Sequence, residues 1–575
     1  MSFSAIRTIA TSAMMASQVQ IQVTSSNIAN ADTEGYSRKI ATQIATVTGS
    51  VSSGTAITAI ASNVDKYLLR DLVAATSIQS AATISESFAN SLQSLFGNVS
   101  TDEDGSTSIA ATIADMESAL SSLSGTPESD ILANVALESI ETLATQLRET
   151  SGLIQGLRED ADGQIADTVT NINEALETID SLNDQIVTAT ARKLSTADLE
   201  DQRNQALQTL AEAIDVSYCV SSDGTMRIAT SSGTVLLDSK VHALSYDPAA
   251  IVTADTVFEA ITVDGKDITG TLSGGTIGAL LEQRDDVLPE VQDELDSLAT
   301  GLIDALNVAY NAGTTLPAPD SLTGTTSINP SDSLSATGTT RIALVDDGGG
   351  LVSYADFDLS AYTTIGDLVG AIDATTGFDA SVTDGVLTIA STGGSGIAIA
   401  GIDAEIGSDS AGFSAFFGLN DLLTGTGAAD IAVAESVASN GLSTATLSAA
   451  ASLTAGTQVV SYSQDFVRSL TDALSEDQSF AAAGALGATS TSLAEYAAKI
   501  VADVASRASG AETGLETAQS AYGSLSDAFL SETGVNIDEE TANLTEYQQL
   551  YSASAQLFEV LNAMFDALLS AAQSA

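Results

Sequence analysis

Residues 26–39 read SNIANADTEGYSRK, and this stretch separates an apolar N-terminal segment from the rest of the chain. Before it, only Arg7 is charged, and Ile6, Ile9 and Val23 recur at the spacing of one helix face. Asn and Gly are residue types that end helices and form turns. The sequence therefore predicts an amphipathic helix that ends in a turn at this stretch.

The other end of the chain carries a second helical pattern. Its large side chains alternate gaps of three and four residues, which is the spacing of a heptad seam. The seam consists of Leu544, Tyr547, Tyr551, Ser554, Phe558, Leu561, Phe565 and Leu568. A helix over 538–572 would be about 50 Å long at the α-helical rise per residue. It would begin with Asp538, Glu539 and Glu540, where the helix dipole favours acids.

Both terminal helices require a partner surface. Isolated helices are marginal in water, and a large apolar side chain gains about 1.5–3 kcal/mol only when it is buried. We expect the two helices to pair with each other first and with neighbouring subunits second. The alternative, in which both pack on an ordinary globular body, stays open at this point.

Composition bounds the class of protein. The 575 residues suggest about four domains, and 75 acidic against 18 basic residues give a formal net charge of −57. Such a polyanion is a poor partner for nucleic acid or anionic lipid. No run reaches 18 apolar residues, so no membrane-spanning helix is expected.

A single cysteine, Cys219, excludes an intramolecular disulfide. Its context, VSYCV, is typical of a strand, and we expect a buried, inert thiol there. Gln18, Gln20 and Gln22 interrupt the N-terminal apolar run, so an ordinary cleaved signal peptide is not expected.

Periodicity along the chain predicts an elongated, mainly α-helical protein with β-rich parts. Long helices are expected at 64–97, 128–191 and 276–312, and Asn183 interrupts an apolar seam where it could fix register. The period changes to two in hairpins at about 216–270, among them HALSY and FEAITV. The hairpin FDASVTDGVLTIAS is expected to turn at Asp384-Gly385.

Three domains follow from these patterns. The stretch TTLPAPD at 314–320 breaks the helical pattern, and the Gly-, Ser-, Thr- and Asp-rich residues after it suggest an insertion. The predicted domains are an inner coiled coil of terminal helices (1–60 and 530–575), an elongated helical domain (61–315 and 456–529) and an inserted β-rich outer domain (320–455).

No motif in the sequence predicts catalysis, a metal or a cofactor. His242 is the single histidine and lies in a predicted strand, where a structural role is expected. The acidic stretch TDEDGSTS resembles a fragment of a calcium loop but lacks the closing Glu, so we interpret it as a solvated loop. Glycines at 393–401 are not followed by the Lys-Ser/Thr of a phosphate-binding loop.

The stretch Asn27-Ile28-Ala29-Asn30, followed by Thr33-Glu34-Gly35-Tyr36, resembles the N-terminal motif of bacterial flagellar axial proteins. The continuation through Arg38 is similar to the hook-associated protein 1 (FlgK) family of hook–filament junction proteins. Further similarity to that family lies in Gly534–Glu540 with the helix after it, in Asp198–Asn204, and in Ile277–Leu281 with Arg284-Asp285. Glu34 departs from the family, which often has Pro there.

The resemblance implies a structural protein that adapts the hook to the filament and is required for filament assembly and motility. The terminal helices would line a tube, disordered in the free monomer and folded on assembly. It implies self-assembly into a ring or tubular layer, with hook protein on one side and the second hook-associated protein on the other. It also implies type III export to the extracellular flagellum and an export chaperone on the C-terminal helix.

The resemblance also selects residues for the assembly motif: Asn27, Ile28, Asn30, Gly35, Tyr36 and Arg38. Asn30 and Gly35 are expected to adopt positive φ, and Arg38 to bridge carboxylates between domains or subunits. Three alternatives remain: a hook or distal-rod protein, a flagellin-like filament subunit, and an enzyme on a flagellar scaffold with chemistry in 320–455.

Overall fold

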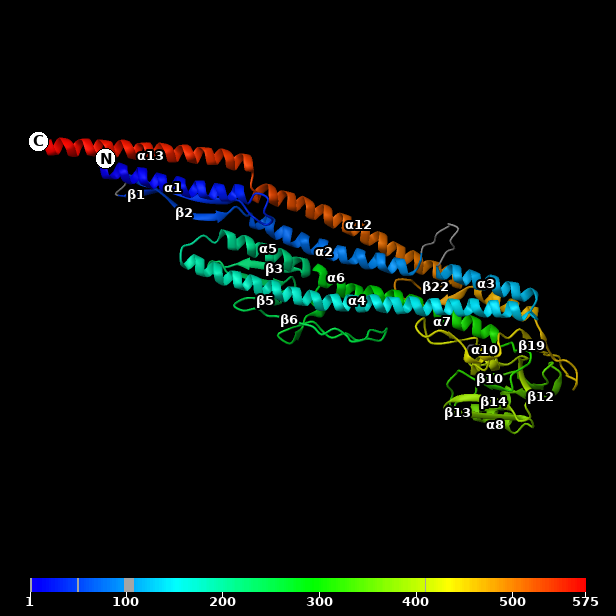
Figure 1. Ribbon diagram of the computed structural model, residues 1–575. Helices are drawn as coiled ribbons and strands as arrows, with labels where there is room; N and C mark the ends of the chain where they lie inside the picture. The colour runs from blue at the N-terminus through cyan, green and yellow to red at the C-terminus, as the bar shows by residue number, and fades with distance from the viewer. Residues whose placement is uncertain (1–2, 49–50, 98–107, 409, 575) are drawn as a thin grey trace.

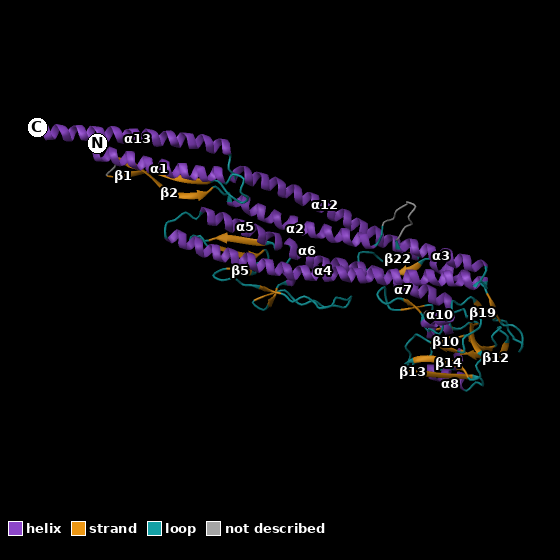
Figure 2. Cartoon of the chain, in the orientation of Figure 1, coloured by secondary structure: helices purple, strands orange, loops and turns teal. Residues whose placement is uncertain are grey.

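The computed structural model describes residues 3–48, 51–97, 108–408 and 410–574. The molecule is elongated, with paired terminal helices at one end, a helical body in the middle and a β-rich part at the other end (Figure 1). Figure 2 shows that helices dominate everywhere except in that β-rich part. The predicted fold class is therefore confirmed. Most of the stretch TDEDGSTS lies outside the described residues.

The two termini pair as antiparallel helices. Helix α1 (Phe3–Ala29) lies beside α13 (Ile537–Ser574), whose end extends beyond the start of α1 (Figure 1). A hairpin of β1 (Lys39–Thr48) and β2 (Val51–Ser62) packs along α1. The Ser12 hydroxyl accepts a hydrogen bond from the Thr55 amide at 3.1 Å. Both predicted terminal helices are confirmed, and the hairpin was not predicted.

The body consists of long helices packed side by side. They are α2 (Lys66–Leu95), α3 (Ile109–Gly125), α4 (Asp130–Ala191), α5 (Ala197–Ala213), α6 (Gly275–Glu282), α7 (Leu288–Tyr310), α11 (Gln464–Ser475) and α12 (Leu493–Thr533). Side chains of Asp65, Ser129 and Ser492 cap the first turns of α2, α4 and α12, which satisfies amides that would otherwise lack partners. The three predicted long helices are confirmed.

Asn183 lies on the predicted seam of α4 and is buried. Its carboxamide donates to the Met226 carbonyl and accepts from the Met226 amide, each at 2.9 Å. It also accepts a 3.0 Å hydrogen bond from Arg203. The residue therefore docks a β-strand on the helix, because a strand edge supplies both a donor and an acceptor to one carboxamide.

That strand belongs to a three-stranded sheet in the order β3-β4-β5. The strands are β3 (Val216–Val220), β4 (Met226–Thr230) and β5 (Val235–Leu237). Cys219 lies in β3 as predicted, but its thiol is exposed, so the expectation of burial was wrong. Strand side chains alternate between faces, and Val216 and Tyr218 occupy the face that packs on the body.

The hairpin pattern after this sheet is weaker than predicted. Only short strands form, namely β6 (Leu244–Ser245), β7 (Thr262–Val263) and β8 (Lys266–Asp267), followed by the 3₁₀ turn η1 (Thr269–Thr271). Most of FEAITV is not a strand. Phe258 instead places its ring 4.0 Å from the Arg284 guanidinium, in the π-helical segment η2 (Gln283–Val287) that joins α6 to α7. This cation–π contact replaces strand pairing.

The β-rich end contains two three-stranded sheets, ordered β12-β11-β15 and β13-β14-β9, and two-stranded pairs. Its elements are β9 (Ser321–Thr323), β10 (Ala336–Thr337), β11 (Thr339–Val345), β12 (Leu351–Asp358), η3 (Leu359–Ala361), α8 (Ile365–Asp373), β13 (Phe378–Thr383), β14 (Val386–Ser391), β15 (Gly396–Gly401), β16 (Glu405–Ile406), α9 (Phe413–Phe417), β17 (Leu423–Thr424), β18 (Ala432–Val433), α10 (Glu435–Asn440), β19 (Ala445–Leu447) and β20 (Val460–Tyr462). The predicted turn at Asp384-Gly385 is confirmed, with φ of 52° and 82°.

The β-rich end has its own buried core, separate from that of the helical body. Asn420 joins the two parts, because its side-chain amide donates to the carbonyls of Tyr310 and Gly313 at the end of α7. Buried residues of 422–442 belong to the core of the body. The domain limits proposed from the sequence stay a prediction.

Glu294 of α7 is a fully buried carboxyl group under the hairpin of β21 (Gln478–Phe480) and β22 (Thr489–Thr491). One oxygen accepts a 3.0 Å hydrogen bond from the Ala485 amide, and the other has no partner. Burial raises the pKa of Glu294 to about 7, and the nearby Asp503 carboxylate adds to the rise.

We expect Glu294→Gln to remove a pH-dependent part of the stability. The pKa rises from 4.5 to about 7 on folding, so between these values the folded protein binds more protons than the unfolded chain. The free energy of unfolding therefore falls as pH increases through this window, by at most about 3 kcal/mol. Gln stays neutral, so the variant should lose less stability than the parent protein in urea unfolding between pH 5.5 and pH 8.

The control is Glu282→Gln, which removes an exposed carboxylate from α6 and should keep the parent's pH slope. An unchanged slope in Glu294→Gln would mean that the buried carboxyl group is already ionised at pH 5.5, contrary to the expectation.

Candidate functional site at the base of the terminal helices

Three segments that are distant in sequence meet around Asn27, near the end of α1. This side chain is buried and makes four hydrogen bonds. Its amide donates to the Lys39 carbonyl and to a Glu540 carboxylate oxygen, each at 3.0 Å. Its carbonyl oxygen accepts from the Tyr36 hydroxyl at 2.9 Å and from the Lys39 amide at 3.0 Å. Asn27 thereby joins α1, the start of β1 and the start of α13.

Arg38 completes the contact with α13. Its guanidinium contacts Glu540 at 2.8 Å and Glu539 at 2.7 Å. Its amide donates to the Thr533 carbonyl at the end of α12. Burial lowers the pKa of Arg38, but the hydrogen bonds to these two carboxylates outweigh it, and the net shift is upward. Arg38 therefore stays charged and ties the turn to the α12–α13 connection.

A buried ion pair attaches the same turn to the body. The Lys39 ammonium contacts Asp201 of α5, and both side chains are buried. Asp201 also accepts hydrogen bonds from the Ser37 amide at 2.9 Å and its hydroxyl at 2.6 Å. The Lys39 ammonium lies 4.5 Å from the Tyr36 ring. Burial raises the pKa of Tyr36, and nearby acids raise it further, so the hydroxyl remains a donor.

Gly35 allows the turn to approach α5 closely. Its φ is +71°, and a Cβ at this position would lie 2.0 Å from the Gln205 side chain. Gln205 donates a 2.8 Å hydrogen bond to the Glu34 carbonyl. Any other residue would be strained at this φ, and its Cβ would require the Gln205 side chain to move. The expectation for Gly35 is confirmed.

The expectation of positive φ at Asn30 was wrong, because no positive φ occurs there among the described residues. The Asn30 amide and side chain both donate to the Ser26 carbonyl and extend the last turn of α1. The turn that follows is therefore closed by Gly35.

The predicted motif residues divide into two groups. Asn27, Gly35, Tyr36 and Arg38 lie where the turn after α1 contacts α5 and the start of α13, together with Lys39, Asp201 and Glu540; we call this cluster the joint. Ile28 is half-buried, and the Asn30 side chain forms hydrogen bonds only within its own turn region. Sequence reasoning missed the roles of Lys39, Asp201 and Glu540. The segments DLEDQRN (198–204) and NIDEE (536–540), which contain Asp201 and Glu540, are both similar to one family. No periodicity in the sequence indicates that they contact the turn.

The predicted seam residues lie between α1 and α13 to different degrees. Val23 and Leu561 are buried, and Ile6, Ile9, Leu544, Tyr547 and Phe558 are half-buried. Tyr551, Phe565 and Leu568 remain exposed, Phe565 by 57%. The pairing with α1 therefore covers only part of the seam, and the assignment of the remainder to subunit contacts stays a prediction.

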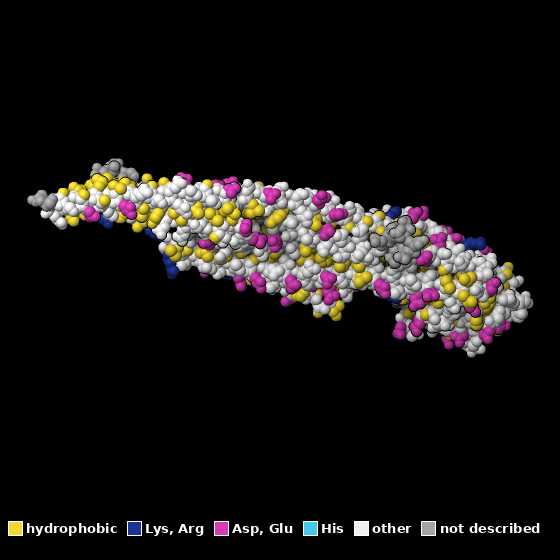
Figure 3. Space-filling view, turned by 45° about the horizontal axis from the view of Figure 1, so that its top comes forward, with side chains coloured by type: hydrophobic (Ala, Val, Ile, Leu, Met, Phe, Trp, Pro, Cys, Tyr) yellow, Lys and Arg dark blue, Asp and Glu magenta, His cyan; other side chains and the backbone are white. Residues whose placement is uncertain are grey.

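The terminal end of the molecule is almost free of charge. Residues 1–64 carry three cations and two anions, and residues 541–575 carry three anions and no cation. These segments together carry −2, which leaves −55 of the total on the rest of the chain. Figure 3 shows hydrophobic side chains gathered along this end and acidic ones along the body. Self-repulsion between copies is therefore weakest here.

The described residues hold no group of three or more His, Cys, Asp or Glu side chains arranged to bind a metal ion. His242 lies between two carboxylates, Asp238 and Asp264, in neighbouring turns. In the part of the chain that the structure describes, no helix combines the length and apolar character needed to cross a membrane.

Three regions of the chain match models of flagellar protein families. Residues 89–321 match the flagellar hook-associated protein FlgK helical domain. Residues 8–36 match the flagella basal body rod protein model, and residues 526–571 match the flagellar basal body rod FlgEFG protein C-terminal model. The joint thus contains residues from all three matched regions.

Individual proteins resemble the chain over nearly its whole length. Flagellar hook-associated protein 1 of Escherichia coli K12 is 24% identical over 98% of both chains. The protein of the same name from Salmonella typhimurium LT2 is also 24% identical over 98% of both chains. A solved structure, the flagellar hook junction protein FlgK from Burkholderia pseudomallei, aligns with a TM-score of 0.47 and 17% identity, covering 80% of this chain and 99% of that one.

Replacing Asp201 by Asn should open the turn. The substitution leaves the Lys39 ammonium buried without its carboxylate, which typically costs about 3–5 kcal/mol. Trypsin cleavage after Arg38 and Lys39 requires local opening, so its rate should increase roughly 100-fold or more. Asp198→Asn is the matched control, because this carboxylate lies 3.5 Å from the same ammonium but is 80% exposed. Equal cleavage rates in the two variants would contradict a structural role for Asp201.

Asn27→Leu should release α13 from the joint. Leu has a similar volume but leaves the Lys39 amide, the Lys39 carbonyl and the Glu540 carboxylate without this partner. Buried unsatisfied groups cost about 1–3 kcal/mol each, so amide hydrogen exchange at residues 37–40 should accelerate by about 100-fold or more. Asn30→Leu is the comparison variant and should change exchange there far less, since the hydrogen bonds of Asn30 in the described chain go to Ser26, Asn27 and Thr33 and not to Lys39 or α13.

Proposed function

We propose that the chain belongs to the flagellar hook-associated protein 1 family, whose members resemble it over nearly its whole length, and that it is the adaptor between hook and filament in the bacterial flagellum. The family is one of structural flagellar proteins, and we propose a role without catalysis for this chain. The match of the helical domain model to 89–321 favours this function over a hook, distal-rod or flagellin-like subunit.

The observation that carries the proposal is the apolar terminal end, whose net charge is close to zero. A protein with a net charge of −57 must assemble through surfaces where copies do not repel one another. In the described chain, the terminal helices and the hairpin beside them combine a low net charge with exposed apolar side chains along one end, among them Met15, Ile44 and Met564. We propose that copies self-assemble into a ring or tubular layer through this end.

The joint around Asn27 suits this role. It holds the terminal helices on the body by buried hydrogen bonds and ion pairs, so a force on the helices is transmitted to the body. The Lys39–Asp201 pair and the Arg38–Glu540 pair attach two different elements to one turn. The joint therefore sets the direction in which the body leaves the proposed tube.

The family places this chain among flagellar axial components. We propose hook protein as its neighbour on one side and the second hook-associated protein on the other. We further propose type III export to the extracellular flagellum and an export chaperone on α13 before assembly. The apolar side chains that α13 exposes, such as Leu557 and Phe565, are the surface that such a chaperone would cover.

Deletion of the gene should produce cells with hooks but without filaments. The reason is that flagellin would lack an adaptor on which to polymerise and would be shed as monomer. The measurement combines electron microscopy of the cells with an assay of flagellin in the culture medium. A plasmid carrying the wild-type gene should restore filaments and serves as the control.

Two other results would contradict the proposal. Loss of the hooks themselves would identify a hook or rod component. Normal filaments in a strain shown to contain no second copy of the gene would exclude the junction role.

A further inference from the structure

Helix α13 carries a second apolar row that its pairing with α1 does not cover. The row again alternates gaps of three and four residues, each position one residue before a position of the first seam. It consists of Leu550, Ala553, Leu557, Val560, Met564 and Ala567. All six side chains are exposed, Val560 by 56%. A helix with two adjacent apolar faces is suited to contact two neighbours at once.

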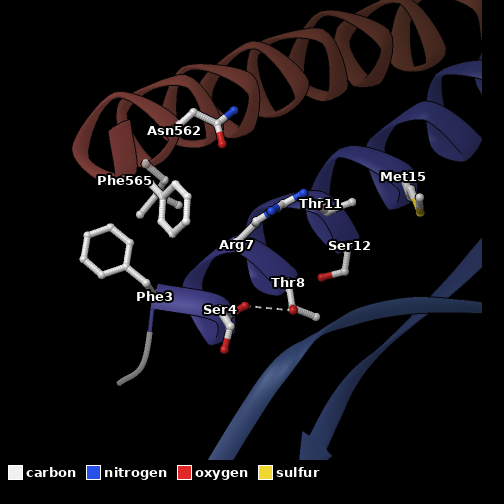
Figure 4. Close-up of a pocket in the computed structure, with 10 residues that line it drawn as sticks. Phe3, Ser4, Arg7, Thr8, Thr11, Ser12, Met15, Asn562 and Phe565 are labelled. Carbon is white, nitrogen blue, oxygen red and sulfur yellow. Dashed lines mark hydrogen bonds between the residues drawn. The ribbon is translucent and has the colours of Figure 1, made fainter. Parts of the chain in front are cut away.

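A groove of about 580 Å³ lies between α1 and α13 at the same end. Phe3, Arg7 and Met15 contribute to it from α1, and Leu561 and Phe565 contribute from α13. Figure 4 shows Phe3, Arg7 and Phe565 around this space, with Asn562 at its α13 side. Met15 is 63% exposed. The groove therefore combines these apolar side chains with the Ser and Thr side chains of α1, Asn562 and one exposed cation, Arg7.

The groove and the second row occupy the same level along the helix axis. The Arg7 guanidinium lies 5.7 Å from the Phe558 ring, which aligns these two residues. The helices are antiparallel with equal rise per residue, so Met15 is level with about residue 550 and Phe3 with about residue 562. The α1 side of the groove thus spans the same length as the row from Leu550 to Met564.

The groove and the row also face different directions. Leu561 and Phe565 border the groove, and each directly follows a residue of the row, Val560 or Met564. One residue along an α-helix corresponds to a rotation of about 100°. One copy can therefore offer its groove to one neighbour and its row to another without conflict.

We propose that the groove of each copy holds the second apolar row of α13 from a neighbouring copy of this chain. This inference rests on the proposed self-assembly and specifies its surfaces. The contact is heterologous, since groove meets row, and repetition of such a contact closes a ring or extends a tube. Copies related by rotation about an axis parallel to the helices keep groove and row at the same level.

The charges favour a second copy as the occupant. The groove carries Arg7, and α13 has only the acids Glu546, Glu559 and Asp566 after residue 540 and no cation. An α13 helix therefore approaches the groove with weak attraction. The body of another copy, which carries −55, would bring many buried carboxylates instead.

Cysteine cross-linking tests the contact in assembled flagella. In a Cys219→Ser background, Met15→Cys and Leu550→Cys, which the same-level contact places side by side in neighbouring copies, are combined in the full chain and expressed in the deletion strain. A short bis-maleimide reagent should join copies into a ladder of dimers, trimers and larger products. The matched control keeps Leu550→Cys and replaces Met15→Cys by Ile251→Cys, an exposed position on the body, and should give no ladder.

A second pair of variants tests the contact by charge. Leu550→Glu places a carboxylate on the row at the level of Met15, away from Arg7, and should reduce the fraction of cells with filaments about tenfold or more. Ser552→Glu adds the same charge at the heptad position of the natural Glu559 and should leave filaments intact.

The outcomes separate the two proposals. Filaments that form without a ladder, together with filaments in the Leu550→Glu strain, would overturn the groove–row contact while the junction role stands. Normal filaments in the deletion strain would overturn the junction role itself.

Discussion

One buried carboxamide, that of Asn27, connects the three parts on which the molecule's shape depends. It receives and donates hydrogen bonds across the end of α1, the start of β1 and the start of α13. A carboxamide has donors and an acceptor at fixed angles, so it specifies how these segments cross. Apolar packing between α1 and α13 supplies stabilisation but tolerates sliding, whereas this joint defines register and direction.

The joint also separates two parts of the molecule that differ in net charge. Beyond it, the body carries nearly all the negative charge, and the terminal end carries almost none. Charge keeps bodies apart, and apolar helices with little charge can pack closely. An adaptor layer needs both properties, since its copies must touch along a tube and still remain soluble before assembly. The arrangement places the proposed contact surface at one end and most of the negative charge on the rest of the molecule.

Periodicity in the sequence predicted the elements well where burial alone determines structure. The seams of α4 and α13 and the turn at Asp384-Gly385 follow from local patterns. Prediction failed where a side chain has partners distant in sequence. Phe258 contacts the Arg284 guanidinium instead of pairing in a strand, and Cys219 faces solvent because only one face of β3 packs on the body. Neither outcome is encoded in the nearest neighbours of these residues.

The sequence by itself determined that the ends are apolar helices, that a turn containing Gly35 follows the first, and that no catalytic motif is present. Only the tertiary structure decided which residues meet there. Lys39 with Asp201, and Asn27 with Glu540, are separated by 162 and 513 positions. No local pattern records such distances, because hydrogen bonds and ion pairs form between groups that the whole fold brings together.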